Sequence, residues 1–219
     1  ERADVAAPRT DENSRIAHEQ LLAKRTAGQI DVYFVGDSIT RRWGTSDEQW
    51  KDLLENWNAN FKGWNAANFG WGADKTQNML WRLQNGELDG VKPKVVVVMA
   101  GTNNIGNASP VGDADSRAAD VARGVAALLK EIRKRAPGAT VVLTGITPRN
   151  DNMDVMPVVD AANRQIAALA DGKSIRYINI NDELATPDGV LRDGMAFDGL
   201  HLTPKAYQHW ANALKPILM

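Results

Sequence analysis

Short apolar segments alternate with longer amphipathic ones along most of the chain. The segment 94–100 contains four consecutive valines, and 30–35 and 140–145 have a similar β-rich composition. Stretches with apolar residues at helical spacing lie between such segments, as 113–135 does after the four valines. Parallel strands need crossover connections of this length, usually through a helix. The alternation therefore predicts an α/β fold with a mostly parallel sheet.

The rest of the chain continues this pattern within one domain. The first dozen residues are polar and contain Pro8, so we expect them to form a loose arm. Residues 1–29 are assigned to this arm and a helix packed on the domain, and residues 30–219 to a single domain, because no repeat or linker interrupts them. Thr203 is the expected N-cap of the last helix. Further strands are predicted at 64–69 and 174–180, and further helices at 14–26, 47–57, 74–83, 158–170 and 203–218.

Composition narrows the classes of function. The formal net charge is −1, so there is no basic excess to neutralise phosphates, and nucleic acid is not the expected partner. The absence of cysteine excludes disulfides, thiolate catalysis and cysteine-ligated zinc. No segment approaches the ~20 apolar residues that a membrane span needs. The chain starts at Glu1, so we expect that a signal peptide has been removed and that the protein is secreted or periplasmic, with a cytoplasmic location as the alternative.

Three segments at loops carry residue types that catalyse ester hydrolysis. Residues 36–40, Gly-Asp-Ser-Ile-Thr, follow the first predicted strand, and residues 101–104, Gly-Thr-Asn-Asn, follow the strand with four valines. Residues 198–201, Asp-Gly-Leu-His, precede the last helix. Ligands of open α/β sheets bind at the carboxyl ends of the strands, which is where the first two segments lie.

A serine esterase needs a hydroxyl, a base that takes its proton, and a carboxylate that orients the base. Ser38 supplies the hydroxyl, and the backbone N–H groups of a following helix can stabilise an oxyanion. His201 is the expected base, because imidazole with its ordinary pKa of about 6.5 is mostly neutral at pH 7. Asp198, three residues earlier, can hold the imidazole, and the side-chain amide of Asn103 can donate to the oxyanion.

Each segment alone has a simpler interpretation. Gly-Asp-Ser and Gly-Thr-Asn-Asn are common turn sequences, and an aspartate before a helix is often only a cap. His18 and His209 lie in no motif and are not expected to be catalytic. Asp37 is expected to fasten its loop rather than act as a base, since a carboxylate beside the nucleophile would oppose oxyanion formation. The combination of the three segments at one sheet edge favours catalysis over three unrelated turns.

Together with residues 68–74, Asn-Phe-Gly-Trp-Gly-Ala-Asp, these segments resemble the four sequence blocks of the SGNH, or GDSL, hydrolases. The resemblance runs from about residue 30 to the C-terminus. The family's oxyanion glycine immediately precedes an aspartate, and in this chain Ala73 occupies that position. A backbone N–H can still come from alanine, but alanine is strained if φ is positive, and Gly72 is then the fallback donor. The blocks are 36–38 for the nucleophile, 68–74 for the glycine block, 101–104 for the asparagine block and 198–201 for the final Asp-x-x-His.

A closer resemblance is to the catalytic subunits of brain-type platelet-activating-factor acetylhydrolase and to bacterial carbohydrate acetyl esterases. It is carried by Asn68-Phe69-Gly70, by the segment 80–88, by Lys92-Pro93-Lys94 and by residues 101–104. The resemblance implies a flavodoxin-like three-layer α/β/α fold and removal of short acyl groups, above all acetyl. It further implies Ser38 as nucleophile and first oxyanion donor, Ala73 and Asn103 as the other donors, and Asp198 and His201 as the rest of a triad.

The substrate is expected to be a small ester whose alcohol is a saccharide. The reaction is expected to need no cofactor or metal. Ile39 and Leu200 flank the nucleophile and the base in the sequence, so they are expected to wall the acyl pocket. Trp71, Trp43 and Arg149 are candidates for contacting the alcohol, with packing or a surface position as the alternative. The chain is expected to be a monomer or a homodimer. The rival functions are a lysophospholipase or thioesterase, a phospholipid deacetylase of the acetylhydrolase type, and a binding module that keeps the fold without activity.

Overall fold

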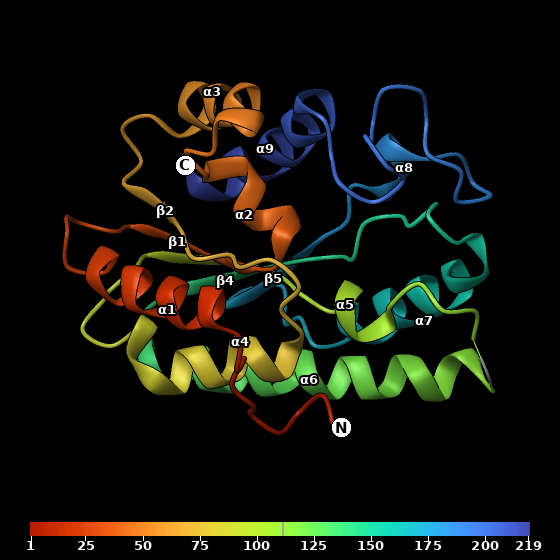
Figure 1. Ribbon diagram of the computed structural model, residues 1–219, viewed down its shortest axis with the longest axis horizontal. Coiled ribbons are helices and arrows are strands. Elements are labelled where there is room, and N and C mark those ends of the chain that lie inside the picture. Colours follow the sequence, from red (N-terminus) through yellow and green to blue (C-terminus); the bar gives the residue numbers. More distant parts are fainter. Residues whose placement is uncertain (111) are drawn as a thin grey trace.

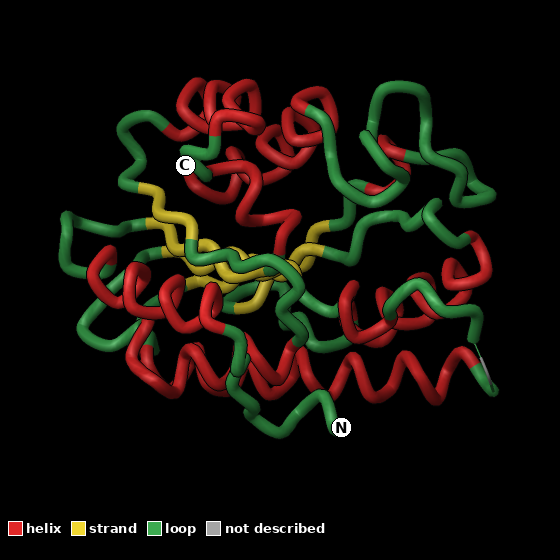
Figure 2. The backbone as a smooth tube through the Cα atoms, viewed as in Figure 1, coloured by secondary structure: helices red, strands yellow, loops and turns green. Residues whose placement is uncertain are grey.

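The computed structural model describes residues 1–110 and 112–219, and a parallel sheet lies at its centre (Figures 1 and 2). The sheet has five strands in the order β2-β1-β3-β4-β5, and every neighbouring pair is parallel. This arrangement confirms the predicted α/β fold, although the strands are shorter than predicted. The strands are β1 (Val32–Gly36), β2 (Ala66–Asn68), β3 (Val95–Met99), β4 (Thr140–Thr144) and β5 (Ile175–Ile178).

Helices cover both faces of the sheet, which gives three layers (Figure 1). One layer contains α1 (Glu12–Lys24), α4 (Thr76–Arg82) with a π-helical turn (Leu83–Glu87), α5 (Thr102–Ile105), α6 (Ala114–Arg135) and α7 (Met156–Ala167), which follows a 3₁₀ turn (Met153–Val155). The other layer contains α2 (Ser38–Gly44), a 3₁₀ turn (Glu48–Trp50), α3 (Lys51–Phe61), α8 (Asn181–Leu184) and α9 (Pro204–Leu218). No helix among residues 1–110 and 112–219 is long and apolar enough to cross a bilayer.

The two cores follow from the side-chain alternation of the strands. In β1, Tyr33 and Val35 pack in the core under α4 and α6, whereas Val32 and Phe34 pack in the core under α2 and α9. The valines of β3 divide between the faces in the same way. Successive side chains of a strand point to opposite faces, so a continuous apolar run is what a strand buried on both sides requires.

Aromatic side chains fill the core beneath α2 and α9. Trp43 is fully buried and stacks on Trp210 at 5.0 Å between ring centroids, and Phe34 meets Trp57 edge to face at 4.8 Å. Tyr207 on α9 donates its hydroxyl hydrogen to the backbone oxygen of Ile39 on α2. Helices α2 and α9, which begin at or next to two of the predicted site segments, are therefore held together by one rigid cluster.

The N-terminal arm is packed rather than loose. Ala3 is buried, and its backbone oxygen accepts a hydrogen bond from the Thr76 hydroxyl at 2.8 Å. The backbone of Ala7 is bonded at both its N–H and its oxygen to α4, at Gln77 and Asn78. The polar composition of the arm concealed these contacts, because they use backbone groups and small side chains.

Helix boundaries differ from the prediction mainly at turns. The first helix begins after Asp11, whose carboxylate accepts a hydrogen bond from the Ser14 N–H at 2.9 Å, and it ends at Lys24, two residues before its predicted end. Thr203 caps α9 as predicted, through its hydroxyl and the N–H of Ala206. The helix predicted at 47–57 is a 3₁₀ turn followed by α3, and the short helices α5 and α8 were not predicted.

Candidate active site

The Ser38 side chain lies at the first residue of α2, directly after β1. The turn between them is tight, because a Cβ on Gly36 would lie 2.0 Å from the Thr40 Oγ1 atom. Asp37 caps the helix by accepting a hydrogen bond from the Ile39 N–H at 2.9 Å. Burial raises the pKa of Asp37 to about 7, with the Ile39 hydrogen bond acting in the opposite direction. Asp37 thus holds the loop, as its sequence position predicted.

Ser38 contacts a histidine and an aspartate from the other end of the chain. The Ser38 Oγ atom lies 3.0 Å from His201 Nε2, and His201 Nδ1 lies 2.7 Å from Asp198 Oδ2. The second carboxylate oxygen, Oδ1, accepts hydrogen bonds from the backbone N–H groups of Leu200 at 3.0 Å and His201 at 2.7 Å. The structure therefore brings the three predicted residues into one chain of hydrogen bonds.

Hydrogen bonds keep the Asp198 carboxyl ionised. Its partial burial raises the pKa, but the backbone and ring N–H groups of His201 and the N–H of Leu200 outweigh this effect and lower the pKa of Asp198 to about 2. A carboxylate at neutral pH accepts from Nδ1–H, so the ring's Nε2 faces Ser38 as a proton acceptor.

Backbone and amide donors surround Ser38 on its other side. The Gly72 backbone lies against the serine, since a Cβ on Gly72 would be 3.9 Å from the Ser38 Cβ. In the described part of the chain, the N–H groups of Ser38, Gly72 and Ala73 have no protein acceptor. The Asn103 amide donates one hydrogen to the Asp74 backbone oxygen at 2.9 Å, which leaves its second hydrogen available.

Ala73 has φ of +64°, in the region that favours glycine. The position therefore has a backbone conformation that glycine adopts freely, and the alanine is strained there. Both Ala73 and Gly72 remain candidates for the backbone oxyanion donor.

The model of the GDSL-like lipase/acylhydrolase family matches residues 34–209, which include all of these groups. The chain belongs to this family. As a GDSL acylhydrolase, it is an ester hydrolase of the carboxylic-ester type.

Curated relatives of this GDSL acylhydrolase carry acetylhydrolase names. It is 34% identical over 204 residues to platelet-activating factor acetylhydrolase IB subunit alpha2 of Rattus norvegicus, across 92% of this chain and 82% of the relative. It is 32% identical over 207 residues to the alpha1 subunit of Homo sapiens, across 92% of this chain and 81% of the relative.

Solved structures share the fold. A GDSL-like lipase from Bacteroides thetaiotaomicron superposes with a TM-score of 0.67 at 18% identity, covering 92% of this chain and 96% of the other. A carbohydrate esterase family 3 protein from Talaromyces cellulolyticus superposes with a TM-score of 0.59 at 17% identity, covering 87% and 96%.

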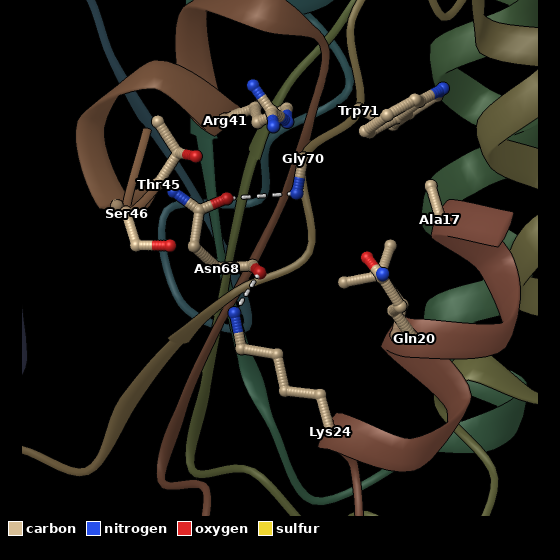
Figure 3. A pocket seen from close by; sticks show the side chains of 11 residues that line it. Ala17, Gln20, Lys24, Arg41, Thr45, Ser46, Asn68, Gly70 and Trp71 are labelled. Atoms are coloured by element: carbon tan, nitrogen blue, oxygen red, sulfur yellow. Dashed lines mark hydrogen bonds between the residues drawn. The ribbon is translucent and has the colours of Figure 1, made fainter. Parts of the chain in front are cut away.

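A polar cavity of about 210 Å³ lies beside the glycine block of the acylhydrolase, between α1 and the end of α2 (Figure 3). Arg41 lies over the Trp71 ring, 5.0 Å from its centroid, and both line this cavity. The Lys24 ammonium projects from α1 and donates to the Asn68 backbone oxygen at 2.7 Å. Burial lowers the pKa of Lys24. Thr45 and Ser46 add hydroxyl groups, Ala17 and Leu21 add apolar surface, and the lining contains no carboxylate.

The other predicted substrate contacts have different positions. Ile39 is fully buried in the aromatic core and exposes no surface to an acyl group, whereas Leu200 is partly exposed at the edge of that core. Trp43 is fully buried, so it is a packing residue. Arg149 is buried as well, and it donates to the Thr102 backbone oxygen at 2.8 Å.

The two remaining histidines pair with glutamates away from the triad. His18 Nδ1 lies 2.8 Å from Glu87 Oε1, and His209 pairs with Glu183.

Sequence reasoning missed a buried ion cluster behind the glycine block. The Arg82 guanidinium lies 2.7 Å from the Asp74 carboxylate and 2.5 Å from that of Glu87, and both carboxylates are fully buried. Arg9, from the N-terminal arm, reaches the same aspartate at 3.2 Å. Arg82 and Glu87 lie in the segment 80–88 that carries the family resemblance, but no spacing rule connects them to Asp74 or Arg9.

Proposed function

We propose that the chain is a serine esterase that removes acetyl and other short acyl groups from an alcohol, with a sugar ester as the favoured substrate. The observation that carries this proposal is the chain of hydrogen bonds from Ser38 through His201 to Asp198. Nucleophile, base and orienting carboxylate stand in the order that acyl transfer to serine needs.

In the first half of the reaction, Ser38 Oγ attacks the ester carbonyl carbon while His201 Nε2 takes the hydroxyl proton. The carbonyl oxygen becomes an oxyanion, which the N–H groups of Ser38 and of Ala73 or Gly72 stabilise together with the Asn103 amide. The carbon–oxygen bond to the alcohol then breaks, and His201 gives its proton to the departing oxygen. Asp198 stabilises the imidazolium that exists between these two proton transfers.

In the second half, water attacks the acyl-serine and passes a proton to His201. Collapse of the second tetrahedral intermediate releases the carboxylic acid and returns the proton to Ser38 Oγ. In each half, His201 takes one proton from the attacking oxygen and gives it to the departing oxygen, so water replaces the proton that Ser38 loses to the alcohol.

The preference for a sugar ester draws on the polar cavity beside Trp71, whose lining includes Gly70 and Trp71 of the glycine block but not Ser38 (Figure 3). Hydroxyl, amide and cationic donors line it, which suits an alcohol with several oxygen atoms. The fold shared with a carbohydrate esterase is compatible with this choice. The preference for acetyl follows the resemblance to acetylhydrolases and the names of the relatives.

A second candidate is removal of acetyl from a phospholipid. The curated relatives are named for platelet-activating factor, and the Lys24 and Arg41 cations in the cavity would meet a phosphate group. Initial rates on an acetylated xyloside and on a short-chain acetyl-glycerophosphocholine, measured side by side, separate the two alcohols.

The test of the reaction itself is a series of p-nitrophenyl esters from acetate to laurate, with wild type and Ser38→Ala. We expect acetate to be preferred and the activity to vanish in the variant. A fluorophosphonate probe should label the wild type and not the variant. Equal activity of the two proteins would contradict the role of Ser38, whereas a wild type with neither activity nor labelling would favour a binding module that keeps the fold.

A further inference from the structure

We infer that Arg9, in the N-terminal arm, is a positioning residue that aims the Ala73 N–H at the oxyanion. The inference rests on the proposed function, since it assigns a purpose to that N–H. Arg9 lies outside the residues 34–209 that the family model matches, and it belongs to none of the four blocks. Its side chain is 28% exposed, so it is accessible to substitution without opening a core.

Arg9 contacts the peptide group that joins Gly72 to Ala73. Arg9 Nη1 donates to the Gly72 backbone oxygen at 2.9 Å. That oxygen and the Ala73 N–H belong to the same peptide group, and the described residues contain no cis peptide bond. In a trans peptide the C=O and N–H bonds point in opposite directions. By holding the oxygen on the side of the arm, Arg9 directs the Ala73 N–H away from the arm.

The opposite side of this loop faces the nucleophile. Gly72 lies against Ser38, and the Ala73 N–H has no protein acceptor among residues 1–110 and 112–219. An exposed N–H in a turn can rotate unless its peptide is held. The turn has one internal hydrogen bond, from the Asp74 N–H to the Trp71 oxygen at 3.4 Å. The positive φ of Ala73 makes the turn less favourable than its alternatives, so the Arg9 contact adds to what maintains it.

The same guanidinium also contacts Asp74, the residue that holds the Asn103 amide. Arg9 Nη1 lies 3.2 Å from Asp74 Oδ1, and the backbone oxygen of Asp74 holds the Asn103 amide at 2.9 Å. Arg82 fixes the other oxygen of the Asp74 carboxylate and the Phe69 backbone oxygen at 2.9 Å. Arg82 thus clamps the loop from the core and Arg9 from the surface. Of the two, Arg9 alone contacts the Gly72–Ala73 peptide.

The arm itself is fixed where it carries Arg9. Backbone hydrogen bonds join Ala7 to α4, and Arg9 Nε donates to Asp11, the N-cap of α1, at 3.1 Å. The guanidinium is therefore held between two anchored points of the chain, which is what a positioning contact requires.

The test compares Arg9→Met, which keeps the apolar stem, with Arg9→Lys and with Arg2→Met as the matched control. Arg2 lies in the same arm but pairs with Asp4 near the surface, and within residues 1–110 and 112–219 it has no hydrogen bond to the glycine block. We expect Arg9→Met to lower kcat about tenfold with KM within twofold, because an oriented oxyanion donor acts on the transition state and a complete loss costs about 10²–10³-fold. Arg9→Lys should recover part of the loss, and Arg2→Met should match wild type.

Two further measurements separate positioning from folding. Rates are normalised to active sites titrated with the fluorophosphonate, so unfolded protein does not contribute. Affinity for methylboronic acid, whose serine adduct is a tetrahedral anion, should fall in Arg9→Met in parallel with kcat. A normalised kcat within twofold of wild type, or a loss confined to KM, would overturn the inference. Persistent activity in Ser38→Ala would instead overturn the proposed function, so the two failures are distinguishable.

Discussion

Replacing Ala73 by glycine should stabilise the protein, against the usual effect of introducing glycine. Ala73 has φ of +64°, and the left-handed conformation costs a residue with a Cβ about 1–2 kcal/mol. Glycine avoids that cost but adds conformational freedom to the unfolded chain, which costs about 0.4–1 kcal/mol. The difference leaves a net gain of roughly 0.5–1 kcal/mol in the free energy of unfolding. For a chain of this length, such a gain raises Tm by about 1–4 °C.

The neighbouring residue provides a matched control. Gly72 does not have a positive φ, and a Cβ there would meet nothing closer than the Ser38 Cβ at 3.9 Å. Gly72→Ala therefore changes the unfolded chain by the same entropy in the opposite direction and should raise Tm slightly. Calorimetry and urea unfolding of both variants give the comparison. If Ala73→Gly lowers Tm by as much as Gly72→Ala raises it, the backbone at position 73 carries no strain and the reasoning is refuted.

Three further results are expected. Asp198→Asn should lower kcat on p-nitrophenyl acetate by roughly 10⁴-fold and His201→Ala by about 10⁶-fold, because the carboxylate only orients and stabilises the base; equal losses would contradict these roles. Leu200→Ala should raise the rate on butyrate relative to acetate, and an unchanged ratio would remove Leu200 from the acyl pocket. Asp37 binds a proton in the native state up to its pKa of about 7 but in the unfolded state only up to about 3.9. The free energy of unfolding should therefore fall as the pH rises from about 4 to 7. Asp37→Asn should make this dependence weaker when urea unfolding is measured across the same range.

The sheet and the triad were predictable because each has a strong local signal. Four consecutive valines in β3 indicate a strand buried on both faces, and the structure confirms it. Ser38, Asp198 and His201 stood in recognisable segments next to element boundaries, and the structure brings them within hydrogen-bonding distance.

What sequence reasoning missed depends on contacts between distant parts of the chain. Arg9 lies in a polar arm whose packing on α4 uses mostly backbone groups, and such groups leave no pattern in the sequence. Ile39 was expected at a pocket because it adjoins Ser38, but the first turn of α2 points it into the aromatic core. Neighbours in the sequence of a helix face different directions, so adjacency to a nucleophile does not place a side chain beside the substrate.

The bond between Ser38 and His201 joins residues that are 163 positions apart. The nucleophile is made early and its base late during synthesis, and α9, which follows the base, completes the aromatic cluster around Trp43. A nascent chain whose residues 198–218 are still inside the ribosome exposes the nucleophile without its base. Esterase activity should consequently appear only after α9 has docked, and later than the sheet in translation or refolding. Hydrolysis of a chromogenic acetate ester would then report when α9 docks during folding.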